Sequence, residues 1–332
     1  MTEVLRKYFP MIRTREAILK DIRAQKDLLQ IFQEWTQEQQ EEFLDFCSGS
    51  RGVKMLYDSF FKEILNPESV PERLEALISE VLGRKVKIIQ VLPNDSTRLA
   101  DESSLLVTDI VAELEEGSII NVEIQKIGYN FPGQRCACYS ADLLLRQYKR
   151  VKGEKRKKFS YRDIQSVYTI ILFEKSTREF HKYTKEYLHH FKQKSNTGLQ
   201  LELLQEYYFI PLDIFQKCYH NKGIGNKLDA WLAFLCMDNP EIIVSIVEQY
   251  PEFRAMYGEV YEICRNVEEV MKMFSKELLE LDRNTVQYMI DEMQDTIDRQ
   301  KAELEKQKDD FAGEREELLR RIEELEKRAS EK

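Results

Sequence analysis

Three side chains that could bind a metal ion, Asp109, Glu123 and Gln125, occur in apolar stretches of the chain, where hydrophobic residues are the usual choice. Asp109 lies in the stretch 105–114, and the other two lie in the stretch 118–125. Both stretches have the composition and length that are typical of β-strands. Because successive side chains of a strand point to opposite faces, Glu123 and Gln125 would share one face.

The segment 115–117 joins the two predicted strands and has the sequence Glu-Glu-Gly. A three-residue loop that ends in glycine is typical of a β-hairpin, because its last position takes a positive φ. If Leu114 pairs with Ser118, Asp109 lies opposite Glu123, and both carboxylates share a face with the amide. The other face would pack into a core through Leu106, Ile110, Leu114, Val122 and Ile124.

Two carboxylates in contact repel each other unless a cation, a proton or a basic side chain joins them. A hard divalent ion such as Mg²⁺ takes oxygen ligands, and it commonly uses one or two carboxylates together with water and substrate phosphate. One interpretation is therefore a metal site that acts on a phosphate-containing substrate. In the alternative interpretation, this face of the hairpin is solvated and the acids are ordinary surface residues.

The order of an Asp in one strand, a turn, and Glu-X-Lys in the next strand resembles the PD-(D/E)XK nuclease superfamily. Here the second strand reads Glu123-Ile124-Gln125 and is followed by YNFPGQRCACYSADLLLRQY. This variant resembles one branch, the Rpn family of recombination-promoting nucleases and transposases. The segment KMLYDSFFKEIL at 54–65 resembles the Asp-x-x-Phe-Lys opening of that branch. The resemblance extends from residue 54 to 175, and more loosely to residue 290.

The resemblance implies an α/β fold with a restriction-endonuclease-like core, in which helices flank a mixed central sheet. It also implies hydrolysis of DNA phosphodiesters with Mg²⁺ or Mn²⁺. Asp109 and Glu123 would be the catalytic, metal-binding acids, and the Ile124 carbonyl would be a further ligand. Gln125 stands where lysine is usual; its amide could orient a water molecule, but it carries no positive charge and cannot act as a proton-transfer base. The superfamily often adds an acid from an early helix, for which the candidates are Asp58, Glu75 and Glu80.

A basic segment follows the predicted site. Residues 146–158, RQYKRVKGEKRKK, contain eight Lys or Arg residues and one Glu. In one interpretation this segment contacts the DNA backbone beside the metal site; in the other it is a solvated basic loop. The expected DNA-binding residues are Arg135, Tyr139, Lys149, Arg150, Lys152, Lys155, Arg156, Lys157 and Lys158.

Composition limits the alternatives. The chain has 332 residues, of which 42% are hydrophobic and 33% charged, and its net charge is −9. That charge argues against a generally basic nucleic-acid-binding protein, although an acidic tail can mask a locally basic surface. Six scattered cysteines without a Cys-x-x-Cys motif make a zinc site improbable and suit a reducing cytoplasm. We expect no secretory signal and no membrane span.

Hydrophobic patterns predict strands at 86–92, 105–114, 118–125, 167–173 and 207–215. They predict helices at 14–47, 53–65, 71–83 and 134–150, with a second helix start at Thr36. His189 and His190 are expected to lie on a helix surface or to be partly packed. The predicted organisation is an N-terminal helical arm at 1–50, a nuclease-like domain at 54–215, a helical region at 226–280 and a coiled-coil tail at 283–332.

The tail carries one apolar residue every seven positions: Ile290, Ile297, Leu304, Phe311, Leu318 and Leu325. A heptad repeat of this kind is typical of a coiled coil. The companion position of the heptad becomes polar after Met293, which is typical of a weak or register-selective coiled coil. We therefore expect a homodimer; a single solvated helix is the alternative.

Two functions remain open at this point. The first is a metal-dependent DNA endonuclease, which the resemblance links to recombination or transposition. The second is a catalytically weak nuclease fold that serves as an interaction module and dimerises through its coiled coil. The missing lysine at position 125 favours the second function, whereas the two retained acids favour the first.

Overall fold

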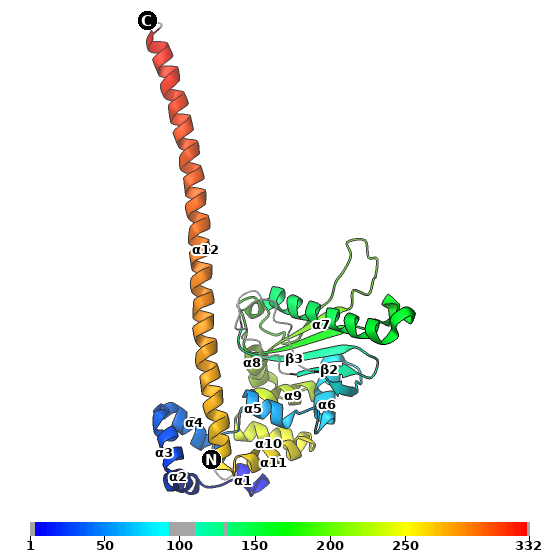
Figure 1. The fold of residues 1–332 in the computed structure, drawn as a ribbon. Helices are drawn as coiled ribbons and strands as arrows, with labels where there is room; N and C mark the ends of the chain where they lie inside the picture. Colours follow the sequence, from blue (N-terminus) through cyan, green and yellow to red (C-terminus); the bar gives the residue numbers. More distant parts are fainter. Residues whose placement is uncertain (1–3, 93–109, 129–131, 331–332) are drawn as a thin grey trace. The chain divides into compact units, whose positions relative to one another are not determined.

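The computed structural model describes residues 4–92, 110–128 and 132–330. The chain divides into two compact units, Met1–Asn284 and Thr285–Lys332. The first unit contains a sheet that is covered by helices, and the second is helical (Figure 1). The sheet and the helices that cover it position the candidate site.

A six-stranded mixed sheet has the order β1-β2-β3-β4-β6-β5 in the part of the chain that the structure describes. Strands β3, β4 and β6 run parallel to one another, and the remaining neighbours are antiparallel. The strands are β1 (Ile88–Val91), β2 (Ile110–Leu114), β3 (Ile119–Ile127), β4 (Val167–Lys175), β5 (His189–Phe191) and β6 (Gln205–Pro211). This arrangement confirms the mixed α/β sheet that was expected.

The predicted hairpin and its register are confirmed for the described residues. Gly117 has a φ of 88°, and its N–H donates to the Leu114 carbonyl at 2.8 Å. The Leu114 N–H donates to the Ser118 carbonyl at 2.8 Å, and Ile110 pairs with Val122. The predicted metal-binding residue Asp109 precedes β2 and lies outside the described residues, as does Leu106.

Helix α7 (Pro132–Lys155) connects β3 to the parallel strand β4. A parallel pair of strands needs a crossover of this kind, and a helix is its usual form. The helix covers one face of the sheet (Figure 1). Below it, Val111, Ile119 and Val167 form a small apolar cluster with Leu143. Residues of β3 that point to this face are therefore covered by α7.

The opposite face of the sheet packs on the main hydrophobic core. That core extends from Leu5 to Phe274 and includes Val122 and Leu172 of the sheet. The helices of this unit, besides α7, are α1 (Val4–Tyr8), α2 (Arg15–Ala24), α3 (Lys26–Glu34), α4 (Gln37–Ser48), α5 (Asp58–Ile64), α6 (Pro71–Leu82), α8 (Leu212–Lys222), α9 (Lys227–Cys236), α10 (Pro240–Gln249), α11 (Phe253–Ile263) and the first turns of α12 (Val267–Ser330). Segments 1–50, 54–215 and 226–280 thus contribute to one core.

The first turns of α12 hold the N-terminal helices against this core. The Phe274 ring lies 5.1 Å from the Trp35 ring, 5.9 Å from Phe43 and 5.5 Å from Phe46, measured between centroids. All four rings belong to the buried cluster. The N-terminal fifty residues are therefore packed into the unit by aromatic burial, which is a large stabilising contribution.

Local capping explains most of the observed helix boundaries. The Thr14 hydroxyl accepts a hydrogen bond from the Ala17 N–H, and Thr36 forms a capping box with Gln39. Both caps were expected from the sequence. The predicted helix 14–47 is nevertheless three helices, because the chain is also extended at Gln25 between α2 and α3. None of the helices described is long and apolar enough to cross a membrane.

Other boundaries differ from the sequence predictions. The strand predicted at 207–215 ends at Pro211, which cannot donate a ladder hydrogen bond, and helix α8 begins at the next residue. The helix predicted at 53–65 begins only at Asp58. The basic run interpreted as a loop is helical through Lys155 and continues as a 3₁₀ turn over Arg156–Lys158.

The helix-surface interpretation of His189 and His190 is wrong, because both belong to the short strand β5. The alternative, that they are partly packed, agrees with their ring contacts to Phe180 and Tyr208. The His190 ring stacks on the Tyr208 ring of β6 with 4.2 Å between centroids. Its Nε2 lies 2.6 Å from a carboxylate oxygen of Glu206. These cross-strand contacts stabilise a strand in a segment with little apolar periodicity.

Lys126 points to the core side of β3, as the alternation of the strand predicts. Its ammonium group lies 2.7 Å from Glu277 Oε1 of α12, and it donates to the Leu56 carbonyl. The second oxygen of Glu277 accepts the N–H of Asp58 at 2.9 Å. Lys126 and Glu277 are both buried. This pair joins β3, α5 and the start of α12.

We predict that Glu277→Gln lowers the free energy of unfolding by about 3–5 kcal/mol, because it leaves the Lys126 charge buried without its partner. The matched control is Glu268→Gln, which removes the exposed i,i+4 pair with Lys272 and should cost less than about 1 kcal/mol. Urea unfolding measures both. Equal, small effects of the two substitutions would contradict this role of the buried pair.

Candidate metal site and DNA interface

A row of polar side chains lies between the sheet and α7. It consists of Asn121, Glu123 and Gln125 on β3 and Thr169 on β4. Their side chains are 0 to 3% exposed. Alternation along β3 and the pairing of Asn121 with Thr169 place all four on the face that α7 covers. The alternative interpretation, in which this face is solvated, is therefore wrong for Glu123 and Gln125.

Glu123 and Gln125 contact each other directly. The Gln125 Nε2 group donates to Glu123 Oε1 at 2.8 Å. The other carboxylate oxygen, Glu123 Oε2, and the amide oxygen of Gln125 have no hydrogen-bond partner among the described residues. Buried polar atoms are nearly always hydrogen-bonded, so each exception needs an explanation. A metal ion, which accepts lone pairs, or a water molecule, which donates hydrogen bonds, would satisfy both oxygens.

The electrostatic surroundings of Glu123 are unusual for a carboxylate. Burial raises the pKa of Glu123, while the hydrogen bond from Gln125 and the charge of Arg135 lower it by less. Burial also raises the pKa of Tyr139 to about 12, with Arg135 opposing and Glu123 adding to the shift. Burial and the nearby Glu123 charge raise the pKa of the Cys136 thiol. The N-terminal turns of α7 thus lie over the Glu123 carboxylate.

Arg135 and Tyr139 are one helical turn apart on α7, so they share one side of the helix. The Arg135 guanidinium lies over the Tyr139 ring, 5.7 Å from its centroid. These two sequence-predicted residues are brought next to Glu123. Ile124, whose carbonyl is a predicted ligand, lies within the paired part of β3 and β4.

The three early-helix acids are not brought to this face. Their helices, α5 and α6, pack on the core side of the sheet, opposite α7 (Figure 1). Asp58 pairs with Lys62 at 2.7 Å and approaches Lys276 at 3.7 Å. Glu75 accepts the Ile88 N–H at 2.8 Å. Glu80 is half-exposed on α6.

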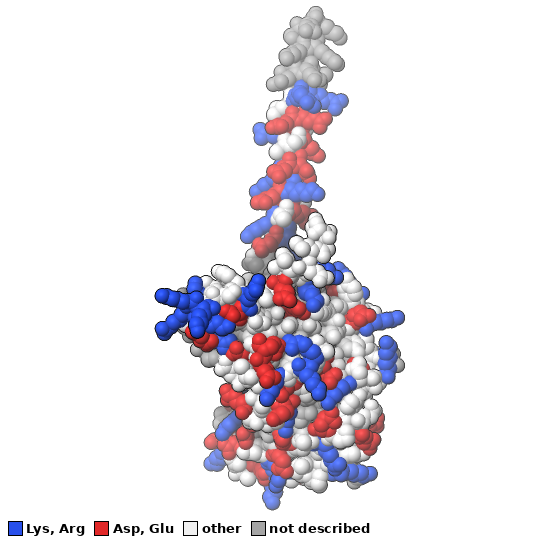
Figure 2. Space-filling view, turned by 90° about the vertical axis from the view of Figure 1, so that its right-hand side faces the viewer, with Lys and Arg blue, Asp and Glu red and all other residues white. Residues whose placement is uncertain are grey.

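The basic residues lie toward the other end of α7. Arg150 forms two contacts with the Glu113 carboxylate, one of them 2.8 Å long. Lys155 pairs with Asp163 at 2.6 Å, and Lys152 donates to the Tyr148 hydroxyl at 2.7 Å. The exposed members of the set are Lys149, Lys152, Lys155, Arg156, Lys157 and Lys158. Figure 2 shows Lys and Arg side chains gathered at one edge of the viewed face, with few acidic side chains among them.

Two polar residues of the row, Asn121 and Thr169, were missed by the sequence reasoning. Asn121 precedes Glu123 by two positions, so strand alternation could have identified it. Thr169 lies in a β-branched run that is typical of a buried strand, and only its pairing with Asn121 reveals its position. Thr169 can therefore be identified only when the register between β3 and β4 is known.

The mixed sheet, the covering helix α7 and the buried acid on β3 together define a restriction-endonuclease-like α/β fold. A family model described as PD-(D/E)XK nuclease family transposase matches residues 55–292. Because the match covers more than half of the chain, the chain belongs to this family. The membership indicates a nuclease or transposition-related function, and nucleases of this superfamily generally use divalent metal ions.

The searches of curated proteins and of solved structures gave no match.

We predict that Glu123→Gln stabilises the metal-free protein at neutral pH. A carboxyl whose pKa is raised on folding binds a proton more tightly in the folded state, so its contribution to stability falls as the pH rises through the two pKa values. The substitution removes this loss, because an amide has no charge to desolvate. Thermal unfolding with a chelator present should show a higher Tm for the variant at pH 7 than for the wild type.

The difference should shrink as the pH falls toward roughly 4, near the ordinary pKa of glutamate, because the wild-type side chain becomes increasingly protonated in both states. A variant that is less stable than the wild type at pH 7 would show that interactions within the metal-free fold already offset the desolvation of the Glu123 charge.

Proposed function

We propose that this chain is a metal-dependent DNA endonuclease that cleaves phosphodiester bonds in recombination or transposition. The observation that supports this function best is the buried Glu123 carboxylate, which has one oxygen held by Gln125 and the other without a described partner. A buried carboxylate with an unpaired oxygen costs folding free energy unless a cation binds it. The Rpn branch of the family remains the expected subgroup.

The residues on this face fit a hard divalent ion. Glu123 Oε2 and Gln125 Oε1 are buried oxygen atoms without a described hydrogen-bond partner, and so is Thr169 Oγ1. Mg²⁺ and Mn²⁺ prefer oxygen ligands. We propose that Asp109, which lies outside the described residues, supplies the second carboxylate, with the Ile124 carbonyl as a further ligand. A bound ion would activate a water molecule and offset charge on the phosphate.

The protein side chains would then orient the reactants. Gln125 holds one oxygen of Glu123, which fixes the direction of the other. Tyr139, with its pKa raised to about 12, stays protonated at neutral pH and can donate a hydrogen bond to a phosphate oxygen. Arg135 supplies positive charge beside the carboxylate, and this is the contribution that Gln125 cannot make.

DNA would contact α7 at two separate places. Arg135 and Lys155 are 20 residue steps apart, which corresponds to about 30 Å of helix at about 1.5 Å per step. That distance corresponds to roughly nine base pairs at about 3.4 Å each. We propose that the exposed basic end of α7 binds the backbone away from the cut and sets the affinity, while Arg135 and Tyr139 act at the site.

An interaction module is the second candidate, and one observation favours it. Along α12, the apolar heptad residues Ile290, Ile297, Leu304, Phe311 and Leu318 are 44 to 70% exposed. A row of large apolar side chains on a long helix usually marks a contact with a partner helix. We propose that the unit Thr285–Lys332 pairs two chains as a coiled coil, which is compatible with either function.

We predict that cleavage of supercoiled DNA requires Mg²⁺ or Mn²⁺ and both acids. Asp109→Asn and Glu123→Gln each remove one negative charge with little change of shape, so each should reduce nicking by at least about 100-fold, the scale of losing an electrostatic contribution. DNA binding should persist, because it comes from basic side chains and loses some repulsion. A plasmid-nicking assay and an electrophoretic mobility assay measure the two effects.

Gln125→Lys restores the residue that is usual in the superfamily and should keep or raise the activity, whereas Gln125→Glu adds a third acid and should abolish it. Metal-dependent cleavage by an Asp109→Ala, Glu123→Ala double variant would show that the site lies elsewhere.

We predict that the full chain is a dimer at micromolar concentration and that truncation after Asp282 yields a monomer. Glu in place of Ile297 and Leu304 should separate the chains in the same way, because like charges in a coiled-coil seam repel. Ala302→Glu, on the same helix but outside both seam positions of the heptad, is the matched control and should leave the dimer intact. Light scattering measures the mass; a monomeric wild type would rule out this contact.

A further inference from the structure

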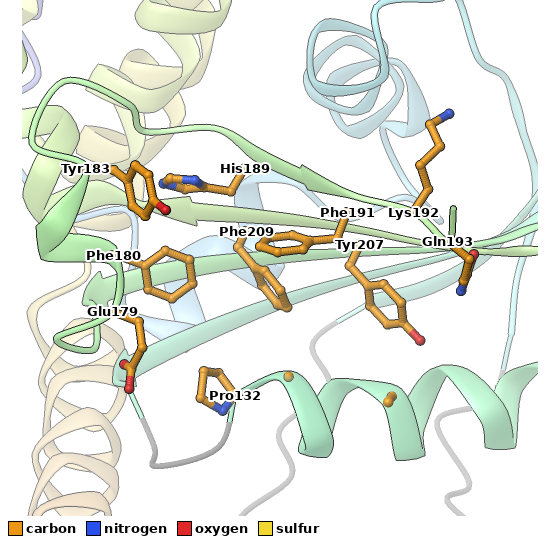
Figure 3. Close-up of a pocket in the computed structure, with 12 residues that line it drawn as sticks. Pro132, Glu179, Phe180, Tyr183, His189, Phe191, Lys192, Gln193, Tyr207 and Phe209 are labelled. Carbon is orange, nitrogen blue, oxygen red and sulfur yellow. The ribbon is translucent and has the colours of Figure 1, made fainter. Parts of the chain in front are cut away.

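An aromatic pocket of about 430 Å³ lies beside the first turns of α7 (Figure 3). Its walls include Phe191, Tyr207 and Phe209 from strands β5 and β6, and Phe180 from the segment after β4. Phe191 is 51% exposed. The Tyr207 and Phe209 rings are nearly parallel, with 19° between their planes. The pocket thus offers flat apolar surfaces that are open to solvent.

The register of the sheet places this pocket on the same face as Glu123. Glu123 pairs with Ile171 of β4, Ile171 with Phe209 of β6, and Phe209 with His189 of β5. Directly paired residues point to the same side of a sheet. Phe209 is therefore two strand spacings from Glu123, or about 10 Å.

Polar groups are present at the pocket as well as aromatic rings. Glu179 and Lys192 lie at opposite ends of it (Figure 3). Hydrogen bonds from Thr177 and from the backbone hold the pKa of Glu179 below its usual range, so it is a carboxylate at neutral pH. His189 Nε2 is buried and has no hydrogen-bond partner among the described residues. Lys192, which approaches Glu206 at 3.4 Å, is half-exposed.

We propose that this pocket binds an unpaired nucleobase of the DNA strand whose phosphate lies at Glu123. The inference rests on the proposed function, because it names the substrate class of that site: DNA with a single-stranded or extruded nucleotide next to the cut. A base would stack on Phe191 and Tyr207, an interaction that every base can make. Its polar edge would face Glu179, and its sugar–phosphate would face Lys192.

The polar groups distinguish a base from a purely apolar ligand. A carboxylate accepts hydrogen bonds from the exocyclic amino groups of cytosine or adenine, as Glu and Asp do from cytosine N4. An apolar ligand would leave the buried His189 Nε2 unpaired, and an acidic peptide would be repelled by Glu179. A base satisfies the rings and these groups together, and its phosphate lies within reach of the neighbouring site.

The test uses the full chain in a chelator, so that binding is separated from cleavage. A single-stranded oligonucleotide carrying one 2-aminopurine should lose fluorescence when the base stacks in the pocket. Phe191→Ala, at an exposed position, should weaken single-strand binding by roughly 5- to 150-fold and restore the fluorescence. It should leave duplex binding unchanged. Ile89→Ala, which removes a 55% exposed side chain on β1 at the opposite edge of the sheet, is the matched control and should have neither effect.

Two further binding measurements test the contribution of the base and that of Glu179. An oligonucleotide of the same length in which every position is abasic should bind the wild type and Phe191→Ala equally. Glu179→Gln should reduce a preference for cytosine or adenine over thymine. Binding of single strands that Phe191→Ala does not weaken, or no single-strand binding by the wild type, would overturn the inference.

The failure of this inference is distinguishable from that of the proposed function. Quenching that depends on Phe191, without cleavage in Mg²⁺ or Mn²⁺, would contradict the endonuclease and leave the base pocket standing. Cleavage that depends on Glu123, with single-strand binding unaffected by Phe191→Ala, would do the reverse.

Discussion

The burial of the Glu123 carboxylate between β3 and α7 is the constraint on which the rest of this structure depends. A charged group taken out of water loses several kcal/mol of solvation unless it is paired. Here the described compensation is one hydrogen bond from Gln125 and the field of Arg135, and it is insufficient, because the pKa of Glu123 stays raised. Acids with perturbed pKa values tend to cluster at functional sites, and we therefore propose that Glu123 serves a ligand or a reaction.

Helix α7 connects the functional parts of the molecule. Its first turns cover Glu123 and border the aromatic pocket, and its last turns carry the exposed basic residues. The helix is held in register by its connection to two parallel strands, β3 and β4, and by the contact of Arg150 with Glu113. Arg150 therefore contributes to the position of the helix, in addition to any contact with DNA. In the proposed function, the distance between the two ends of α7 would set how much DNA the protein spans.

The hairpin, its register and the face of Lys126 were predictable from the sequence, because strand alternation and the loop ending in Gly117 are local signals. The starts of α2 and α4 followed from the caps at Thr14 and Thr36 for the same reason. Thr169 and the pocket at Phe209 were not predictable, since both depend on how distant strands pair. The histidines of β5 were misassigned because the contacts that make this segment a strand, such as that of His190 with Tyr208, are non-local.

The central claim is that Glu123 binds a divalent metal ion. Calorimetric titration of Mn²⁺ into the purified full chain, with and without Glu123→Gln, tests it most directly, because it requires neither DNA nor turnover. The account predicts a saturable site in the wild-type chain that is lost in the variant. Mn²⁺ binding of the same affinity and stoichiometry in Glu123→Gln would contradict it.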